Sequence, residues 1–160
     1  MLKSLSNTLV TSAIIAIATL ALSVTSLTAA PKSTIRFNDA ANDAHAVASM
    51  NSSWTVMRAS GVSMEPYFGN NSILLVDTAV NGRITTGMIV VYEDTDGTLV
   101  GHKVMSTVEN GFITRGINND RADPQVVTMA SIKGVIFGVL NTAENAPAGD
   151  THTVVMGKSR

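Results

Sequence analysis

The sequence predicts a small, mostly β fold, closed or partly open, that follows a single N-terminal hydrophobic helix. Short runs of β-branched and apolar residues, separated by turn residues, occupy the chain from Trp54 to Leu140. The 160 residues leave room for one modest domain after the leader. Roughly seven short strands in a flat sheet would leave edges and one face exposed, so we expect them to close on themselves or form a sandwich.

The N-terminal segment, residues 1–31, is expected to be a membrane anchor. It has no charged side chain from Ser4 to Pro31, and Leu9–Leu22 is almost wholly apolar. The uncharged stretch exceeds the roughly 20 residues that span a bilayer, although its most apolar part has the length of a signal-peptide core. Pro31 disfavours cleavage after Ala30. A cleaved leader, giving a secreted or periplasmic protein, remains the alternative, and export of the following domain is expected in both cases.

Residues 32–53 are rich in Asn, Asp, Ala and Ser, which is typical of a polar spacer or a frayed helix. The domain itself is expected at residues 54–140, and residues 141–160 form a polar tail with one β-like run, Thr153–Met156. Asp96-Gly97 and Asn110-Gly111 predict tight hairpins within the domain. The expected strands are Trp54–Arg58, Ile73–Val76, Met88–Tyr92, Thr98–Thr107, Gly111–Arg115, Val126–Thr128 and Ile132–Leu140.

The composition argues against several classes of function. Eleven basic and twelve acidic residues nearly balance, so nucleic acid is not an expected partner. The absence of cysteine removes disulfides, thiolate catalysis and cysteine-ligated zinc. The sequence also lacks a phosphate-binding glycine-rich loop and a His-Glu-x-x-His motif. No cofactor or metal is therefore expected.

Ser63 is the candidate nucleophile. It lies in Gly61-Val62-Ser63-Met64-Glu65-Pro66, which lacks the second glycine of an α/β-hydrolase elbow. A serine hydroxyl needs a base to accept its proton, and histidine suits that role near neutral pH. His102 is the candidate base within an expected strand, where alternation places it on one face and Lys103 on the other. A half-buried structural histidine is the alternative interpretation.

The loop after the Gly111–Arg115 strand carries two aspartates, Asp120 and Asp123. Either could accept the second imidazole N–H of His102, which would fix the tautomer and stabilise the imidazolium. The alternative is that these residues only shape a loop, since Asp123-Pro124 is a common start of a turn.

In order and spacing, these residues resemble the type I signal peptidases. The matching positions are Gly61-x-Ser63-Met64-x-Pro66, then His102-Lys103-Val104, then Thr114-Arg115-Gly116-x-Asn118-Asn119 with Asp123. The resemblance covers about Arg58 to Leu140 and is to the endoplasmic-reticulum and archaeal-type branch, in which histidine replaces a lysine base. It implies a membrane-bound serine endopeptidase that cleaves signal peptides after small residues, outside the membrane on the exported side.

The same resemblance implies the role of each matching residue. Ser63 corresponds to the nucleophile, His102 to the general base and Asp123 to the aspartate of the triad-like set. Three family aspartates are replaced here, at Ser72, Met88 and Ile117. Gly61 cannot supply a side-chain donor to the oxyanion, so the backbone N–H of Ser63 is expected to be the main donor.

Two alternatives remain open at this point. A Ser63/Lys103 dyad would keep the fold and use the lysine as base, which requires Lys103 on the face of the serine. A divergent, non-catalytic β domain that binds peptides or a partner protein would account for the lost aspartates. In the leading interpretation the partners are preprotein signal peptides and, through the N-terminal segment, membrane lipid.

Overall fold

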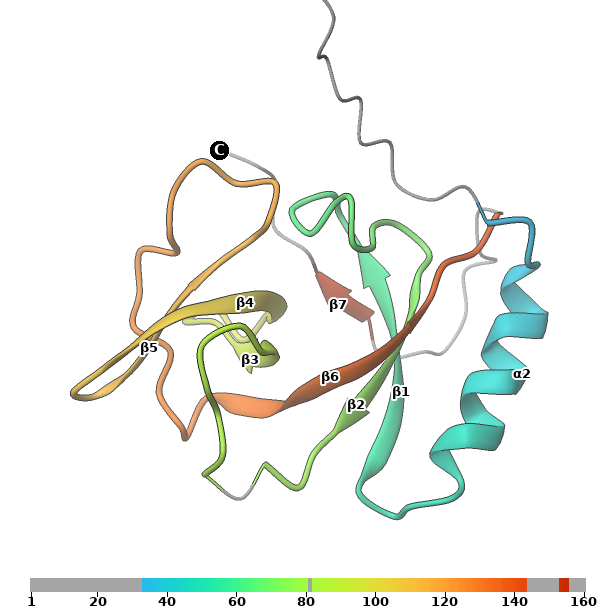
Figure 1. The fold of residues 1–160 in the computed structure, drawn as a ribbon, viewed down its shortest axis with the longest axis horizontal. Helices are drawn as coiled ribbons and strands as arrows, with labels where there is room; N and C mark the ends of the chain where they lie inside the picture. The colour runs from blue at the N-terminus through green and yellow to red at the C-terminus, as the bar shows by residue number, and fades with distance from the viewer. Residues whose placement is uncertain (1–32, 81, 144–152, 156–160) are drawn as a thin grey trace, which may run out of the picture.

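The computed structural model describes residues 33–80, 82–143 and 153–155. Their elements are α2 (Phe37–Ala48), β1 (Trp54–Ser60), β2 (Ile73–Asp77), β3 (Ile89–Glu93), β4 (Leu99–Val108), β5 (Gly111–Arg115), β6 (Ile132–Leu140) and β7 (Thr153–Val155) (Figure 1). The prediction of a mostly β protein is confirmed. The predicted N-terminal hydrophobic helix lies outside the described residues. Among the residues that are described, none belongs to a helix with the length and apolarity of a membrane span.

Six strands form an antiparallel sheet in the order β1-β2-β6-β3-β4-β5. Strand β7 differs, because it runs parallel to β1 and also pairs with β4 at one position. The sheet is strongly curved, and β4 and β5 lie at the opposite side of the molecule from α2 (Figure 1). Strand β7, near the C-terminal end of the sequence, therefore lies beside both β1 and β4.

Both predicted hairpins are present. Glu93 pairs with Leu99 around the turn that contains Gly97, and Val108 pairs with Gly111. Gly97 has a φ of 83° and Gly111 a φ of 151°, which explains the preference for glycine in these turns. The two hairpins fix the register of β3, β4 and β5, and so determine which side chains share a face.

The segment predicted to be a polar spacer or a frayed helix, residues 32–53, contains α2, and this helix lies against the sheet. Its buried positions are Phe37, Ala40, Ala44 and Ala48, which follow the spacing of one helix face. They contact Val56, Ile73 and Leu75 of β1 and β2. Alanines are weak signals of a core when read singly, but here their spacing creates a narrow stripe that lets the helix approach β1 and β2 closely.

Two further hydrophobic clusters lie on opposite faces of β3. One contains Met57, Ala59, Met64, Phe68, Leu74, Val76, Val91 and Ile136. The other contains Ile84, Val90, Tyr92, Val100, Val104, Phe112 and Val127. The strand predicted at Val126–Thr128 is reduced to one bridge, between Val127 and Phe112. That bridge closes the loop that follows β5.

Candidate active site

Ser63 lies in a short turned segment that begins where β1 ends. The amide of Glu65 donates to the carbonyl of Val62 at 3.1 Å, and the amide of Tyr67 donates to the carbonyl of Met64 at 2.9 Å. The side chains of Met64 and Phe68 are fully buried in the hydrophobic cluster beneath this turn. The apolar residue directly after the serine thus anchors the turn and limits the movement of Ser63.

A second segment, Gly116–Asn118, holds Ser63 from the other side. The amide of Asn118 donates to the carbonyl of Ser63 at 2.7 Å, and its side-chain amide donates to the carbonyl of Val62 at 3.2 Å. A Cβ at Gly116 would lie 2.7 Å from the Ser63 carbonyl oxygen and 2.8 Å from its Cβ. Only glycine therefore fits between the loop and the serine without moving one of them.

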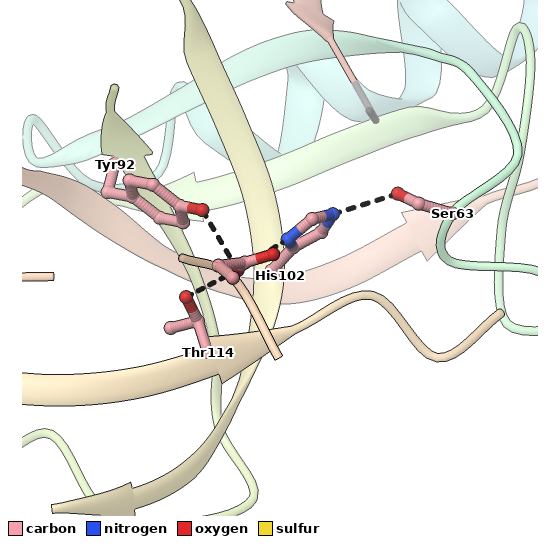
Figure 2. A network of polar contacts seen from close by, with 5 residues as sticks. Ser63, Tyr92, His102 and Thr114 are labelled. Carbon is pink, nitrogen blue, oxygen red and sulfur yellow. Dashed lines mark hydrogen bonds and ion pairs between the residues drawn. The ribbon is translucent and has the colours of Figure 1, made fainter. Parts of the chain in front are cut away.

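His102 extends from the middle of β4 toward Ser63. The Ser63 Oγ and the His102 Nε2 are 2.9 Å apart, and the two residues are 0% and 3% exposed (Figure 2). This distance is within the reach required for proton transfer from a hydroxyl to an imidazole. The burial of both groups excludes competing water from the contact between them.

Asp123 lies beyond the other edge of the imidazole. Its Oδ2 is 2.8 Å from the His102 Nδ1, and it also accepts from the Thr114 hydroxyl at 2.6 Å and from the Tyr92 hydroxyl at 3.0 Å. Figure 2 shows Tyr92 and Thr114 on the side of the imidazole away from Ser63. The amide of Asp123 donates to the carbonyl of Thr114 at 2.8 Å, which fixes the aspartate backbone next to β5.

The surroundings of Asp123 keep it ionised. Burial raises the pKa of this carboxyl, but hydrogen bonds from His102 and Thr114, the charge of His102 and the Tyr92 hydroxyl lower it, and the pKa ends below its ordinary 3.8. Burial, and then the negative charge of Asp123, raise the pKa of Tyr92 well above its ordinary value. Tyr92 therefore remains a protonated donor.

These protonation states determine the tautomer of the histidine. An ionised carboxylate only accepts hydrogen bonds, so the His102 Nδ1 must carry the proton that faces Asp123. In the neutral imidazole the Nε2 then presents its lone pair to the Ser63 hydroxyl. The geometry can therefore accept a proton from Ser63 and stabilise the resulting imidazolium.

Of the predicted residues, Ser63, His102 and Asp123 are brought together, and Lys103 is not part of this hydrogen-bonded set. Its Nζ lies 6.0 Å from the ring centre of Tyr67. Asp120, the other candidate aspartate, lies in the loop that leads to Asp123 and lines a neighbouring cavity. That cavity measures about 710 Å³ and is lined by Tyr92, His102 and Asp123, together with Asp94, Val100 and the rest of loop 119–125.

Tyr92 and Thr114 are parts of the network that sequence reasoning missed. Strand alternation gives a signal for Thr114, because Val104 pairs with Thr114 and lies on the same face as His102. Tyr92 pairs with Val100 in the β3–β4 hairpin, two residues from His102 along β4. A hydroxyl on each flanking strand at that level could have been recognised from the register alone.

Two of the three positions at which the resemblance implies an aspartate, Ser72 and Ile117, have their own local partners. The Ser72 hydroxyl donates to the Asn141 Oδ1 at 2.8 Å and accepts from the Gly69 amide at 3.2 Å. Ile117 contacts the hydrophobic cluster that contains Met64 and Phe68. An apolar side chain at position 117 thus supports the cluster that anchors the Ser63 turn.

No group of three or more His, Cys, Asp or Glu side chains within the described residues is arranged to hold a metal ion. In comparisons with protein-family models, with curated proteins and with solved structures, no match to this chain was found.

Proposed function

We propose that this chain is a membrane-associated serine endopeptidase of the signal-peptidase type, with Ser63 as nucleophile and His102 as general base. One observation carries the proposal: the continuous hydrogen-bonded series from the Ser63 Oγ through the two ring nitrogens of His102 to Asp123. A buried serine with a positioned, partnered imidazole is the arrangement that nucleophilic acyl transfer requires.

In the proposed mechanism the Ser63 Oγ attacks the carbonyl carbon of the scissile peptide bond while the His102 Nε2 accepts the hydroxyl proton. The tetrahedral intermediate collapses when the same proton passes to the leaving amine, which gives an acyl-enzyme on Ser63. Water, deprotonated by His102, then attacks the ester, and the proton passes from His102 to the departing Ser63 Oγ, which releases the acid product and restores the serine. Asp123 remains ionised and stabilises the imidazolium by accepting the hydrogen bond from the His102 Nδ1–H.

The oxyanion would be stabilised by backbone amide donors in the Ser63 turn. Within the described part of the chain, the Ser63 amide donates to no protein acceptor. Gly61 has no side chain to add a second donor. This supports the backbone amide of Ser63 as the principal donor and is compatible with a modest rate enhancement, since one such donor is worth on the order of 10²-fold.

The substrate class rests on the order and spacing of the Ser63, His102 and Asp123 motifs, which resemble those of signal peptidases. We propose that the substrates are exported preproteins cleaved after small residues, with the N-terminal segment as an anchor and the domain on the exported side. His102 is preferred to Lys103 as base because its Nε2 is 2.9 Å from the Ser63 Oγ, whereas the Lys103 Nζ lies over Tyr67.

The test combines a serine-reactive probe with cleavage of a model preprotein. The unaltered chain should be labelled at Ser63 and should release the mature protein, whereas Ser63→Ala should do neither and should unfold at an unchanged temperature. Cleavage by Ser63→Ala would overturn the proposal. Absence of both labelling and cleavage in the unaltered chain, together with binding of signal-peptide segments, would favour the non-catalytic β domain.

A further inference from the structure

Strand β7 lies between the two strands that carry the proposed catalytic residues. Thr153, Val154 and Val155 pair in parallel with Arg58, Ala59 and Ser60 of β1. Val155 also pairs with Val100 of β4. Ser60 precedes the nucleophile by three positions, and Val100 precedes His102 by two.

The edges that β7 covers would otherwise be open in the described sheet. Strand β2 pairs with one side of β1, which leaves the other side to β7. Strand β5 pairs with β4 only from Lys103 onward, so the stretch before Lys103 on that side is left to β7. Unpaired N–H and C=O groups on such edges bind any extended peptide through its main chain.

The direction of β7 matches what a substrate in this position would need. Because β7 is parallel to β1, its chain runs toward the end of β1 that leads into the Ser63 turn. A peptide bound in the same direction would bring its following peptide bond toward Ser63. Main-chain pairing would supply affinity without demanding a fixed sequence.

We propose that β7 occupies the substrate-binding slot and acts as an internal competitor, so that a peptide substrate must displace Thr153–Val155 and form the strand between β1 and β4 itself. This inference rests on the proposed function and adds how the substrate is held and how access to it is restricted. The strand has only three residues, against ten in β4, so exchange with another extended segment loses few pairings.

The first test measures peptide binding in a Ser63→Ala background, where no cleavage occurs. The probe is a fluorescent, uncharged peptide of about eight residues, long enough to form a strand, that ends in Ala-Val-Ala. Val154→Pro removes the central N–H of β7 and disfavours its pairing. The probe should then bind about tenfold more tightly, because an occupied slot lowers apparent affinity in proportion to its free fraction.

Ser159→Pro is the matched control, since it places the same residue in the tail outside β7, and its affinity for the probe should equal that of the Ser63→Ala parent. Equal affinity in Val154→Pro and Ser159→Pro would overturn the inference. Lower affinity in Val154→Pro would also overturn it, because it would mean that β7 helps to build the peptide site.

The second test uses a disulfide to hold β7 against β1. The chain has no cysteine, so Ser60→Cys with Val155→Cys introduces a single pair at register partners. Neighbouring strands lie about 4.8 Å apart, within the range that a disulfide can bridge. In the same Ser63→Ala background the oxidised form should lose probe binding and regain it on reduction. Unchanged binding after verified oxidation would contradict the inference.

Failure of the proposed function and failure of this inference give different results. If Val154→Pro tightens probe binding but Ser63 of the unaltered chain is not labelled, the competitor role of β7 is supported and the protease function is contradicted. If Val154→Pro and Ser159→Pro, both with Ser63 intact, cleave the preprotein with the same KM, the protease function is supported and the competitor role of β7 is contradicted.

Discussion

The two faces of the ladder between β4 and β5 carry polar side chains in very different states. On one face His102 and Thr114 are buried and both contact the same oxygen of Asp123. On the other face Lys103 and Arg115 are register partners and are only partly buried. Lys103 lies over Tyr67, and the buried Nε of Arg115 has no hydrogen-bond partner in the described part of the chain.

The comparison shows that the face of β4 on which a side chain lies determines whether it can join the hydrogen-bonded network. A shift of one residue along β4 changes the face, so histidine and lysine cannot exchange roles without a change in register. On the His102 face each donor has an acceptor, which fixes the imidazole in a low-dielectric environment. On the Lys103 face, no carboxylate of the described residues forms an ion pair with either cation.

The largest expected effect comes from replacing the basic side chain on each face in turn, His102 on one and Lys103 on the other. His102→Gln should lower kcat/KM for a model preprotein by at least about 10³-fold, because the amide cannot accept and return the Ser63 proton. Lys103→Met should change it by less than about threefold, as expected for a partly exposed side chain outside the network. The measurement is cleavage rate at saturating and subsaturating substrate. A large loss in Lys103→Met with activity kept in His102→Gln would reverse the assignment of the base.

Replacing the carboxylate tests whether orientation of the imidazole matters. Asp123→Asn should lower kcat by about 10³-fold, because an amide nitrogen facing Nδ1 favours the tautomer that presents N–H to Ser63. Tyr92→Phe, which removes one hydrogen bond to the same oxygen, should cost less than about tenfold. Comparable losses in the two variants would show that Asp123 acts only as a structural acceptor.

The same variant has a predicted signature in acid. The folded-state pKa of Asp123 lies below 3.8, so the carboxylate stabilises the fold fully above that value, and this stabilisation is lost as the pH falls through the lowered pKa. The difference in unfolding free energy between the unaltered chain and Asp123→Asn should therefore shrink as the pH falls below 3.8. Denaturant titrations across this range would measure it, and a difference that grows in acid would contradict the prediction.

A substitution at Gly116 should have a smaller effect, because it changes the position of Ser63 and replaces none of the proposed reacting groups. Gly116→Ala forces the loop and Ser63 apart, and a displacement of about 1 Å should lower kcat by about 10²-fold with the fold retained. Gly138→Ala is the control, because its Cβ would lie 2.9 Å from the Leu75 side chain, which does not belong to the network. It should lower the melting temperature and leave kcat unchanged. Equal kcat losses in both variants would attribute the effect to general destabilisation.

Much of the architecture could be predicted from local signals. The hairpin dipeptides at Asp96-Gly97 and Asn110-Gly111 determine the register of three strands, and alternation along β4 then separates His102 from Lys103. The motif spacing indicated Ser63, His102 and Asp123, and the structure brings these three residues together. The hairpins and the alternation follow from residues near one another in the sequence or from a repeating period of two, whereas the three site residues were indicated by the resemblance to signal peptidases.

The rest depends on contacts that no local pattern records. Helix α2 is stable because its alanine stripe meets β1 and β2, and its polar composition alone does not indicate this. The Val126–Thr128 run has strand-like residues but contacts only Phe112, so it makes one bridge. Tyr92 and Thr114 acquire their roles only when β3 and β5 flank β4 and the loop returns Asp123 between them.

The proposed reacting groups are also far apart along the chain, which has a consequence for synthesis. Ser63 and His102 are separated by 39 residues, and His102 and Asp123 by 21. A chain still emerging from the ribosome holds a serine without its base and later a base without its acceptor, because each partner appears only as the C-terminal half is made. The bridge between Phe112 and Val127 closes the loop that carries Asp123. An incomplete chain therefore lacks the network and is expected to be inert toward neighbouring nascent proteins.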